Sequence, residues 1–564
     1  MAGNINQPVI ILSNDSAQTK GRDALDRNIS AAKAIAETVR STLGPNGLDK
    51  MIVGSKEGIT ITNDGCTILQ TIEVENPAAR MMIEVAQAME KGVGDGTTSS
   101  TVFASELLSH ALELLDKKVH PTTIIKGYNL ASVKALELLN ELSETIEVQQ
   151  KELEKVTNTA INSRGSEKTK ELLSEVSVKA ALKAEKDGKI NVDTDVHILN
   201  ADGVKAEDTH VVNGIAIFSK RANEDMPTRI ENAKIALVND MEPKDIGSKM
   251  GTVSLGPKIK LEIDTAEKLQ MFSDAKSMPL YKIINRVDEL GVNVVLCKTG
   301  IREEIVYEFA KRGIFAVKIA SEEEVEVVAR ATGARLIPHA ERLSDSDLGH
   351  AKLVEERGKK DKEIVYFEDC QNPHIVTIVT SGRTDTSNMG NSIVGALHVV
   401  KDIIENNKIV PGAGAVEIEI AQGIKEYAPS VPGREYLAIQ AFAEAIESIP
   451  VAIAKNSGFA ATDMLIELRA KHKNGYSKAG IDVNTGTVAD DISTSGIIEP
   501  VSVKIQLIKS ATETANMLLR IDDVISVSRR NPPSENIKAP GEMGPDEGYF
   551  NTVSQPNVPS RLDY

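Results

Sequence analysis

The pattern of apolar residues changes twice along the chain, and this change constrains the fold most. Residues 22–149 carry apolar side chains at helical spacing, and helical patterns return after a strand-like run at 375–380. The stretch 218–369 alternates strand-like runs with helical patterns, at 234–238, 292–296, 303–312, 315–319, 322–332 and 335–337. Strands that alternate with helices are typical of an α/β domain. The sequence therefore predicts a multi-domain α/β protein in which a discontinuous, mostly helical domain is interrupted by an insertion.

Length and composition narrow the class of protein. With 564 residues, the chain exceeds what one hydrophobic core usually serves, so we expect two or three domains. The net charge of −17 argues against a general nucleic-acid binder. The three cysteines are widely spaced and indicate neither a disulfide framework nor a zinc site, which fits a reducing compartment. No run reaches the roughly 18 apolar residues of a membrane span, so we expect a cytoplasmic protein without membrane or nucleic-acid partners.

Residues 94–100 read Gly-Asp-Gly-Thr-Thr-Ser-Ser and precede an apolar helical pattern at 101–118. Glycines at 94 and 96 allow positive φ and a close approach of the backbone to a ligand. The N-terminus of the following helix attracts anions, and Asp95 offers an oxygen ligand to a Mg²⁺ that already carries phosphate oxygens. The hydroxyls at 97–100 supply donors and N-caps for this helix. The stretch predicts a phosphate and metal cradle, with an ordinary turn before a capped helix as the alternative.

Three further loops punctuate the helical parts of the chain. Leu43-Gly44-Pro45 begins the turn after the first helix, and Asn63-Asp64-Gly65 follows a predicted hairpin built from 51–53 and 59–62. Pro411-Gly412-Ala413-Gly414 stands just before an apolar helix at 415–428. The chain lacks a Gly-x-x-x-x-Gly-Lys-Ser/Thr phosphate loop, which argues against a small-molecule kinase or other ATP enzyme on an unrelated fold.

The chain resembles group II chaperonins, the family of the archaeal thermosome and the eukaryotic cytosolic ring. The resemblance rests on four loops in this order and spacing: Leu43-Gly44-Pro45, Asn63-Asp64-Gly65, Gly94-Asp95-Gly96-Thr97-Thr98 and Gly412-Ala413-Gly414. It runs from about residue 8 to 527 and includes family-like strings at 229–236, 347–357, 444–450, 463–470 and 509–525. The resemblance implies an ATP-dependent subunit of a homo- or hetero-oligomeric double ring that encloses and folds non-native proteins.

The same resemblance implies how the domains divide. The mostly helical equatorial domain would comprise residues 1–149 and 406–530, the small intermediate domain 150–217 and 370–405, and the α/β apical domain 218–369. A helical protrusion at 244–281 would carry Leu269, Met271 and Phe272, which either meet non-native clients and neighbouring protrusions or pack inside the domain. Pro279 puts the regularity of its returning helix in doubt. Residues 531–564, rich in Pro, Gly, Asn and Ser, are expected to form a disordered tail.

Carried over residue by residue, the family's nucleotide site gives two groups of candidates. Asp95 is the expected Mg²⁺ ligand. Asp64 is expected near the γ-phosphate and the attacking water, and its alternative role is to cap the helix that begins near Cys66. Ala413 stands where the family has a glycine, which is tolerable if its φ is negative. The ATP ligands are expected to be Leu43, Gly44, Pro45, Gly96, Thr97, Thr98, Ser99, Arg164, Gly412, Ala413, Gly414 and, in preference to Asp490, Asp491.

Hydrolysis is the point at which the sequence departs from the family pattern. The family supplies a water-orienting Asp from an intermediate-domain helix, and alignment on Ala396-Leu397 puts Gly395 at that position and Asn391 where an arginine usually stands. A glycine cannot orient water or accept a proton. Two hypotheses stay open: an ATP-driven folding subunit, or a structural ring subunit that binds ATP but hydrolyses it poorly. A shifted alignment in this diverged segment is the alternative explanation.

Overall fold

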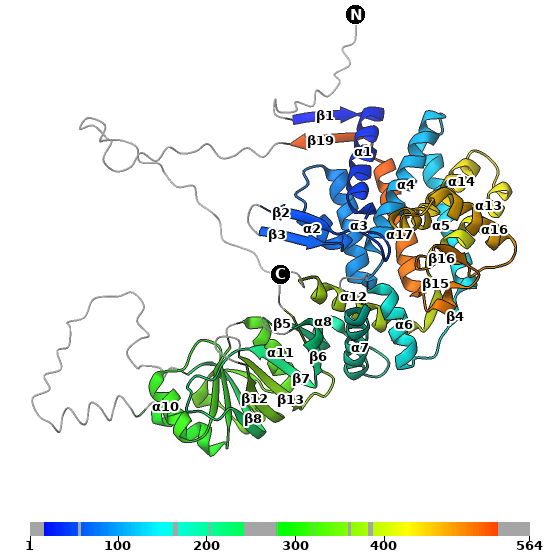
Figure 1. The fold of residues 1–564 in the computed structure, drawn as a ribbon. Helices are drawn as coiled ribbons and strands as arrows, with labels where there is room; N and C mark the ends of the chain where they lie inside the picture. The colour runs from blue at the N-terminus through cyan, green and yellow to red at the C-terminus, as the bar shows by residue number, and fades with distance from the viewer. Residues whose placement is uncertain are drawn as a thin grey trace, which may run out of the picture. The chain divides into compact units, whose positions relative to one another are not determined.

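The computed structural model describes residues 16–54, 58–161, 167–201, 205–241, 278, 280–319, 321–358, 363–381 and 387–527. They fall into two compact units, residues 16–24 with 522–527 and the described residues of 25–521. In the first unit, β1 (Ser16–Lys20) and β19 (Asp523–Val527) pair antiparallel, with Ser16 opposite Val527 (Figure 1). The amide of Gly21 continues this pairing by donating to the Asp522 carbonyl at 2.7 Å.

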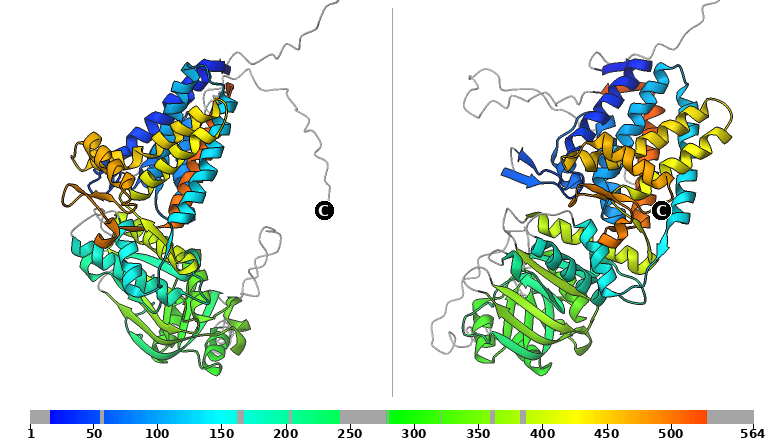
Figure 2. Two further views of the ribbon diagram at one scale, coloured as in Figure 1. Left: turned by 90° about the vertical axis from the view of Figure 1, so that its right-hand side faces the viewer. Right: turned by 45° about the vertical axis from the view of Figure 1, so that its right-hand side comes forward.

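The second unit contains a helical core built from both ends of the chain. Its helices are α1 (Gly21–Arg40, in part), α2 (Gly65–Thr71), α3 (Pro77–Val93), α4 (Thr97–Asp116), α5 (Pro121–Leu142), α13 (Ala415–Tyr427), α14 (Glu435–Ile446), α15 (Ser448–Asn456), α16 (Ala461–Lys473) and α17 (Val501–Leu519). One hydrophobic cluster draws on residues 25–139 and 410–519, so helices from the two ends lie side by side (Figure 2). Phe103 and Tyr128 pack edge-on against Phe442, with ring centroids 5.2 and 6.0 Å apart.

Short strands attach to this core. A hairpin is formed by β2 (Lys50–Gly54) and β3 (Gly58–Thr62). A three-stranded sheet contains β4 (Glu144–Thr145), β15 (Lys408–Pro411) and β18 (Ile498–Pro500). A third pair consists of β16 (Gly480–Asp482) and β17 (Thr487–Ala489). The helical run Glu435–Asn456 has the length and composition of a membrane span, but 67% of its most apolar window is buried. We interpret this run as part of the protein core.

A second hydrophobic cluster joins residues 153–196 to residues 376–409. Its elements are α6 (Gln150–Ala160), α7 (Glu167–Ala184), α8 (Val192–Asp195), β5 (Val196–Ala201), β6 (His210–Val212), β14 (Val376–Ser381) and α12 (Ser387–Asn406). Strand β14 pairs parallel with β5 and antiparallel with β6. Two segments far apart in sequence therefore share one small core.

The stretch between these two segments forms a seven-stranded mixed sheet in the order β10-β9-β8-β12-β13-β7, with β11 also pairing with β8. Its elements are β7 (Gly214–Phe218), β8 (Arg229–Asp240), β9 (Val294–Cys297), α10 (Glu303–Lys311), β10 (Phe315–Lys318), α11 (Glu322–Thr332), β11 (Leu336–His339), β12 (Gly349–Arg357) and β13 (Ile364–Cys370). Along β9, Val294 and Leu296 belong to one hydrophobic cluster and Val295 and Cys297 to another. Alternate side chains thus enter two cores, because the sheet is covered on both faces.

The predicted α/β character of this stretch is confirmed, since its expected strands and helices form within a few residues of the predicted limits. The exact boundaries of the domains stay predictions. Arg164, the predicted tail at 531–564 and the predicted protrusion at 244–281, apart from residues 278, 280 and 281, lie outside the described residues.

Candidate functional site

The loop between α3 and α4 is built from two glycines in the left-handed region. Gly94, at φ 72°, ends α3, and its amide donates to the carbonyls of Met89 and Glu90 at 3.1 Å. Gly96, at φ 77°, is the N-cap of α4, and no side chain caps this helix. The amides that open α4 are therefore left for an anion, at the positive end of the helix dipole.

The helix after this loop begins earlier than the sequence predicted. It starts at Thr97, so the expected start at residue 101 is wrong and the hydroxyls of 97–100 lie inside the first turn. The Ser100 and Thr101 hydroxyls donate back to the Thr97 carbonyl, each at 2.9 Å. Gly96 takes the N-cap position because its backbone adopts the left-handed turn there. The first-turn amides, rather than capping hydroxyls, are thus the main donors of the loop.

Asp95 lies between the two glycines and faces the cavity. Its Oδ1 accepts a hydrogen bond from the Gly96 amide at 2.6 Å. Burial, and then the nearby Glu499 carboxylate, raise the pKa of Asp95 to about 7, while the Gly96 amide and Lys504 oppose this shift. A divalent cation at this position would offset the burial of the carboxylate charge.

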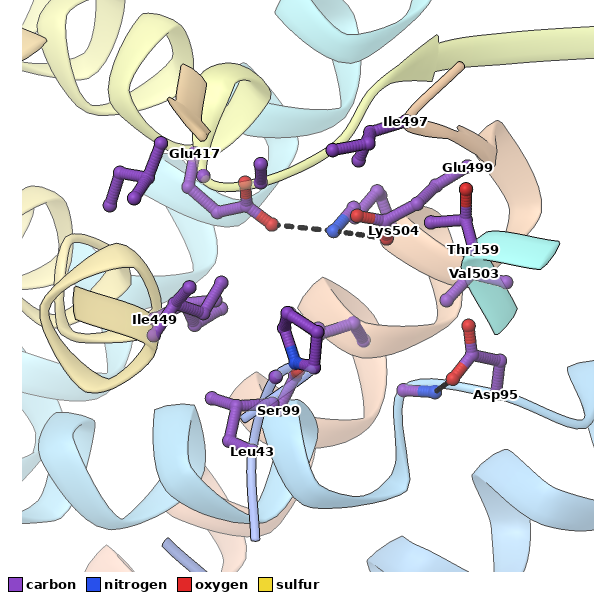
Figure 3. Close-up of a pocket in the computed structure, with 18 of the residues that line it drawn as sticks. Leu43, Asp95, Ser99, Thr159, Glu417, Ile449, Ile497, Glu499, Val503 and Lys504 are labelled. Atoms are coloured by element: carbon purple, nitrogen blue, oxygen red, sulfur yellow. Dashed lines mark hydrogen bonds and ion pairs between the residues drawn. The ribbon is translucent and has the colours of Figure 1, made fainter. Parts of the chain in front are cut away.

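One cavity brings together loops that are far apart in the sequence (Figure 3). Its loop and polar lining residues are Leu43, Gly44, Pro45, Asp95, Gly96, Ser99, Thr159, Ala413, Gly414, Glu417, Glu499 and Lys504. Its aliphatic lining residues are Ile449, Ile453, Ile481, Val483, Ile497, Val503 and Leu507. The Asn456 amide group fixes one of these loops, since it donates to the carbonyls of Arg40 and Leu43 at 2.9 and 2.8 Å. A cavity with aliphatic lining residues beside a helix N-terminus suits a flat aromatic group joined to an anion.

A buried group of three charges forms one side of this cavity. Lys504 Nζ lies 2.6 Å from Glu417 Oε1 and 2.5 Å from Glu499 Oε2, and Figure 3 shows it between the two carboxylates. Burial alone would lower the pKa of Lys504, but Glu417 and Glu499 raise it above its ordinary value. Burial raises the pKa of Glu499. This triad was not predicted from the sequence. The usable signal was a charged residue among the apolar positions of each helix, Glu417 in α13 and Lys504 in α17.

The expected sugar ligand is not at the cavity. Asp491 instead caps a short 3₁₀ helix, Ile492–Ser495, by accepting from the Ser493 amide at 2.9 Å. Asp490 pairs with Lys471 at 2.8 Å. Among the described residues, Glu499 is the carboxylate that this end of the chain contributes to the cavity wall. Asp491 therefore lies outside the cavity lining, and Glu499, eight positions further along the chain, lines the cavity instead.

The glycine turn before α13 also differs from expectation. Ala413 has φ 54°, so the condition under which an alanine would be readily tolerated here, a negative φ, is not met, and a residue with a Cβ holds a left-handed conformation. Its carbonyl accepts from the Ile481 amide at 3.1 Å, which holds the turn in place. A Cβ at Gly414 would come within 2.5 Å of Pro450 Cβ, and one at Gly412 within 2.7 Å of Glu499 Oε1. Gly412 does not line the cavity itself, but it leaves room for Glu499.

A second cavity shares Asp95 with the first. It is lined by Asn63, Asp64, Gly65, Glu90, Gly94, Asp95, Thr97, Thr98, Ala160, Asn391, Ser392 and Gly395. The predicted cap is confirmed, because Asp64 Oδ2 accepts from the Thr67 amide at 2.7 Å at the start of α2. Burial, followed by the charges of Asp64 and Asp95, raises the pKa of Glu90 to about 8. The cavity thus places two predicted residues, Asp64 and Gly395, beside the metal candidate.

Gly395 reaches this cavity through close backbone packing. A Cβ at Gly395 would lie 2.7 Å from the Gly94 carbonyl oxygen, and one at Gly94 would lie 2.9 Å from the Gly395 oxygen. Nearby, Asn391 Nδ2 donates to Thr67 Oγ1 at 3.1 Å. Helix α12 therefore contacts the metal-candidate loop with no side chain at position 395.

The donor set fits Mg²⁺ with a phosphate better than a metal held by protein alone. Within the described ranges, no group of three or more His, Cys, Asp or Glu side chains is placed to hold a metal ion. Mg²⁺ usually keeps one or two protein carboxylates and completes its shell with waters and phosphate oxygens. Asp95 beside the uncapped start of α4 offers such an arrangement.

The fold and this site define a multi-domain α/β protein in which a two-glycine loop precedes a helix N-terminus without a side-chain cap. The chain belongs to the TCP-1/cpn60 chaperonin family, whose model matches residues 35–529, so the predicted resemblance is confirmed. It is 42% identical over 548 residues to a thermosome subunit of Pyrococcus horikoshii, which covers 96% of this chain and 98% of that protein. It is 43% identical to the thermosome subunit beta of Archaeoglobus fulgidus, over 92% of this chain and 95% of that one. It is 42% identical to the thermosome subunit alpha of the same organism, and the match covers 96% of this chain and 98% of that protein.

Proposed function

We propose that the chain is an ATP-dependent molecular chaperone, a subunit of a group II chaperonin ring that encloses and folds non-native proteins. The observation that carries the nucleotide part is the first cavity. It brings the loops at 43–45, 95–99 and 413–414 together around the uncapped start of α4. Family membership and the names of the relatives support the chaperone part. They lend no support to the alternative of a structural subunit that hydrolyses ATP poorly.

In this proposal the adenine packs against the aliphatic lining residues of the first cavity, and Glu499 accepts hydrogen bonds from the sugar hydroxyls. The phosphates lie against the opening amides of α4, with the hydroxyls of Thr97, Thr98 and Ser99 as further donors. Mg²⁺ binds Asp95, and when bound it neutralises the charge that develops on the phosphates. Asp64 remains a candidate for the region of the terminal phosphate, since it lines the neighbouring cavity.

Assembly into a ring is supported by the hairpin formed by β2 and β3. Within the described residues these two strands pair only with each other. Met51, Val53 and Ile59 are 65%, 72% and 62% exposed. Exposed apolar side chains on a two-stranded sheet with open edges mark a surface for another chain. We propose a neighbouring subunit, either a second copy or a paralogue, and a cytoplasmic location for the ring.

Refolding of a chemically denatured protein by the purified, assembled chain tests this function. We expect Mg·ATP to raise the yield of active client well above spontaneous refolding, and native mass spectrometry to report a ring-sized oligomer. The Asp95→Asn variant is the control, because it keeps the size of the side chain and loses its charge. If the wild type gives no nucleotide-dependent gain although it forms rings, the proposed function is wrong.

A further inference from the structure

The second cavity adjoins the place where the proposed function puts the terminal phosphate. The two cavities share Asp95, and Thr97 and Thr98 of the first turn of α4 line the second one. Hydrolysis requires a water placed in line with the bond that breaks and a group that accepts a hydrogen bond from that water. This inference therefore rests on the proposed function, and it concerns which residue of this chain orients the water.

The hydrogen bonds of the cavity's three carboxylates distinguish them. Asp64 accepts from the Thr67 amide at 2.7 Å and is held as the cap of α2. Asp95 accepts from the Gly96 amide at 2.6 Å and is the proposed metal ligand. The Glu90 carboxylate has no hydrogen bond or ion pair to any residue that the structure describes, although it lines the same cavity. Of the three, Glu90 alone has both oxygens uncommitted within the described structure.

The position of Glu90 is fixed by the backbone around it. Glu90 lies in the last turn of α3, and its carbonyl accepts from the Gly94 amide at 3.1 Å. This bond ties the helix end that carries Glu90 to the loop that carries Asp95. Gly395, which lines the same cavity, contacts Gly94 through the backbone and brings no side chain that would take the water's place. Asn391, also on α12, already donates to Thr67 Oγ1.

We propose that Glu90 orients the attacking water in the ATP hydrolysis of this chain. The water oxygen forms the new bond to the terminal phosphorus. The bond from that phosphorus to its bridging oxygen breaks, and its electron pair stays on ADP. One proton of the water passes to the Glu90 carboxylate and from there to solvent. Glu90 thus acts on the water while Asp95 and the amides of α4 hold the phosphates.

Single-turnover hydrolysis of Mg·ATP by the assembled full-length chain, with calorimetric titration of Mg·ADP, tests this role. We expect Glu90→Gln to slow hydrolysis at least about 100-fold, since positioned general bases contribute roughly 10²–10⁴-fold. Its affinity for Mg·ADP should stay within about threefold of the wild type, because the metal site is intact. Glu84→Gln, an exposed position on the same helix, is the matched control and should behave as the wild type.

Glu90→Asp gives the second variant, and it should retain more of the rate than Glu90→Gln because it keeps the carboxylate. Unchanged hydrolysis in Glu90→Gln, or equal rates in the two variants, would overturn the inference while the proposed function stands. An equal loss of affinity and rate would also overturn it, since that result indicates a role in binding or folding. A wild type that binds Mg·ADP but hydrolyses no ATP refutes the role of Glu90, whereas one that binds no nucleotide refutes the proposed function.

Discussion

Removal of the positive charge from the buried triad should destabilise the protein strongly. Lys504 is 5% exposed, and its Nζ lies 2.6 and 2.5 Å from Glu417 and Glu499. At an effective dielectric of about 20, each such contact is worth about 6 kcal/mol of attraction, which offsets the cost of burying the charges. Lys504→Met keeps the length of the side chain and leaves two buried carboxylates close together without a cation. Breaking a buried ion pair typically costs about 3–5 kcal/mol, so we expect a loss of about 4 kcal/mol.

The assay is thermal unfolding of the nucleotide-free protein. In a domain of about 250 residues, each kcal/mol lost from the free energy of unfolding lowers the Tm by roughly 2 °C, so the Tm should fall by about 8 °C at pH 7. The same substitution in a surface pair, Lys134→Met beside Glu137, should change the Tm by less than about 2 °C.

The pH dependence of this deficit distinguishes charge from packing. A buried glutamate without a cation partner can lose its charge by binding a proton. From an ordinary pKa near 4.3, this costs about 3.7 kcal/mol at pH 7 and about 1 kcal/mol at pH 5. The Tm deficit of Lys504→Met should therefore shrink on acidification. An unchanged Tm at pH 7 would refute the electrostatic reasoning, and a deficit that is the same at pH 5 would assign it to packing instead.

Three further outcomes follow from the site. Ala413→Gly should raise stability by about 1 kcal/mol in thermal unfolding, because it relieves a non-glycine residue at φ 54°; a loss of stability would mean that the turn is not strained. Gly395→Asp should lower the Tm, since its Cβ would approach the Gly94 oxygen to 2.7 Å, and an unchanged Tm would show that α12 shifts easily. Because burial raises the pKa of Asp95 to about 7, Mg²⁺ must displace a proton from this carboxylate at lower pH. The Mg²⁺ affinity measured by calorimetry in the presence of ADP should therefore rise about tenfold from pH 6 to pH 8. The same pH dependence in an Asp95→Asn variant would contradict this reasoning.

The sequence predicted those parts of the structure that depend on local patterns. The pairing of β2 with β3 and the Asp64 cap follow from turn chemistry and alternation. Strands β8, β9, β10 and β11 of the α/β sheet follow from apolar runs separated by helical patterns, whereas β12 and β13 were not predicted. The loops at 43–45, 95–99 and 413–414 do meet at one cavity, as the resemblance implied.

What the sequence missed depends on contacts between distant segments. Lys504 and Glu417 are 87 positions apart, and no local pattern reports that they pair. Asp491 caps a short 3₁₀ helix while Glu499 lies in β18, and only the three-dimensional path of the chain shows that β18 brings its carboxylate to the cavity. The left-handed turn at Ala413 accepts a hydrogen bond from the Ile481 amide, which is 68 positions away in the sequence. A run of hydroxyls suggested N-caps after residue 96, but the left-handed glycine at 96 took that position.

The most direct test of the Mg·ATP site is calorimetric titration of ADP into the assembled chain, with and without Mg²⁺, for the wild type and Asp95→Asn. If Asp95 and the opening amides of α4 form the cradle, the wild type binds Mg·ADP with one site per chain. Asp95→Asn then binds it at least about tenfold more weakly and gains little from Mg²⁺. Equal affinity of the two proteins for Mg·ADP, or no binding by the wild type, would contradict the account.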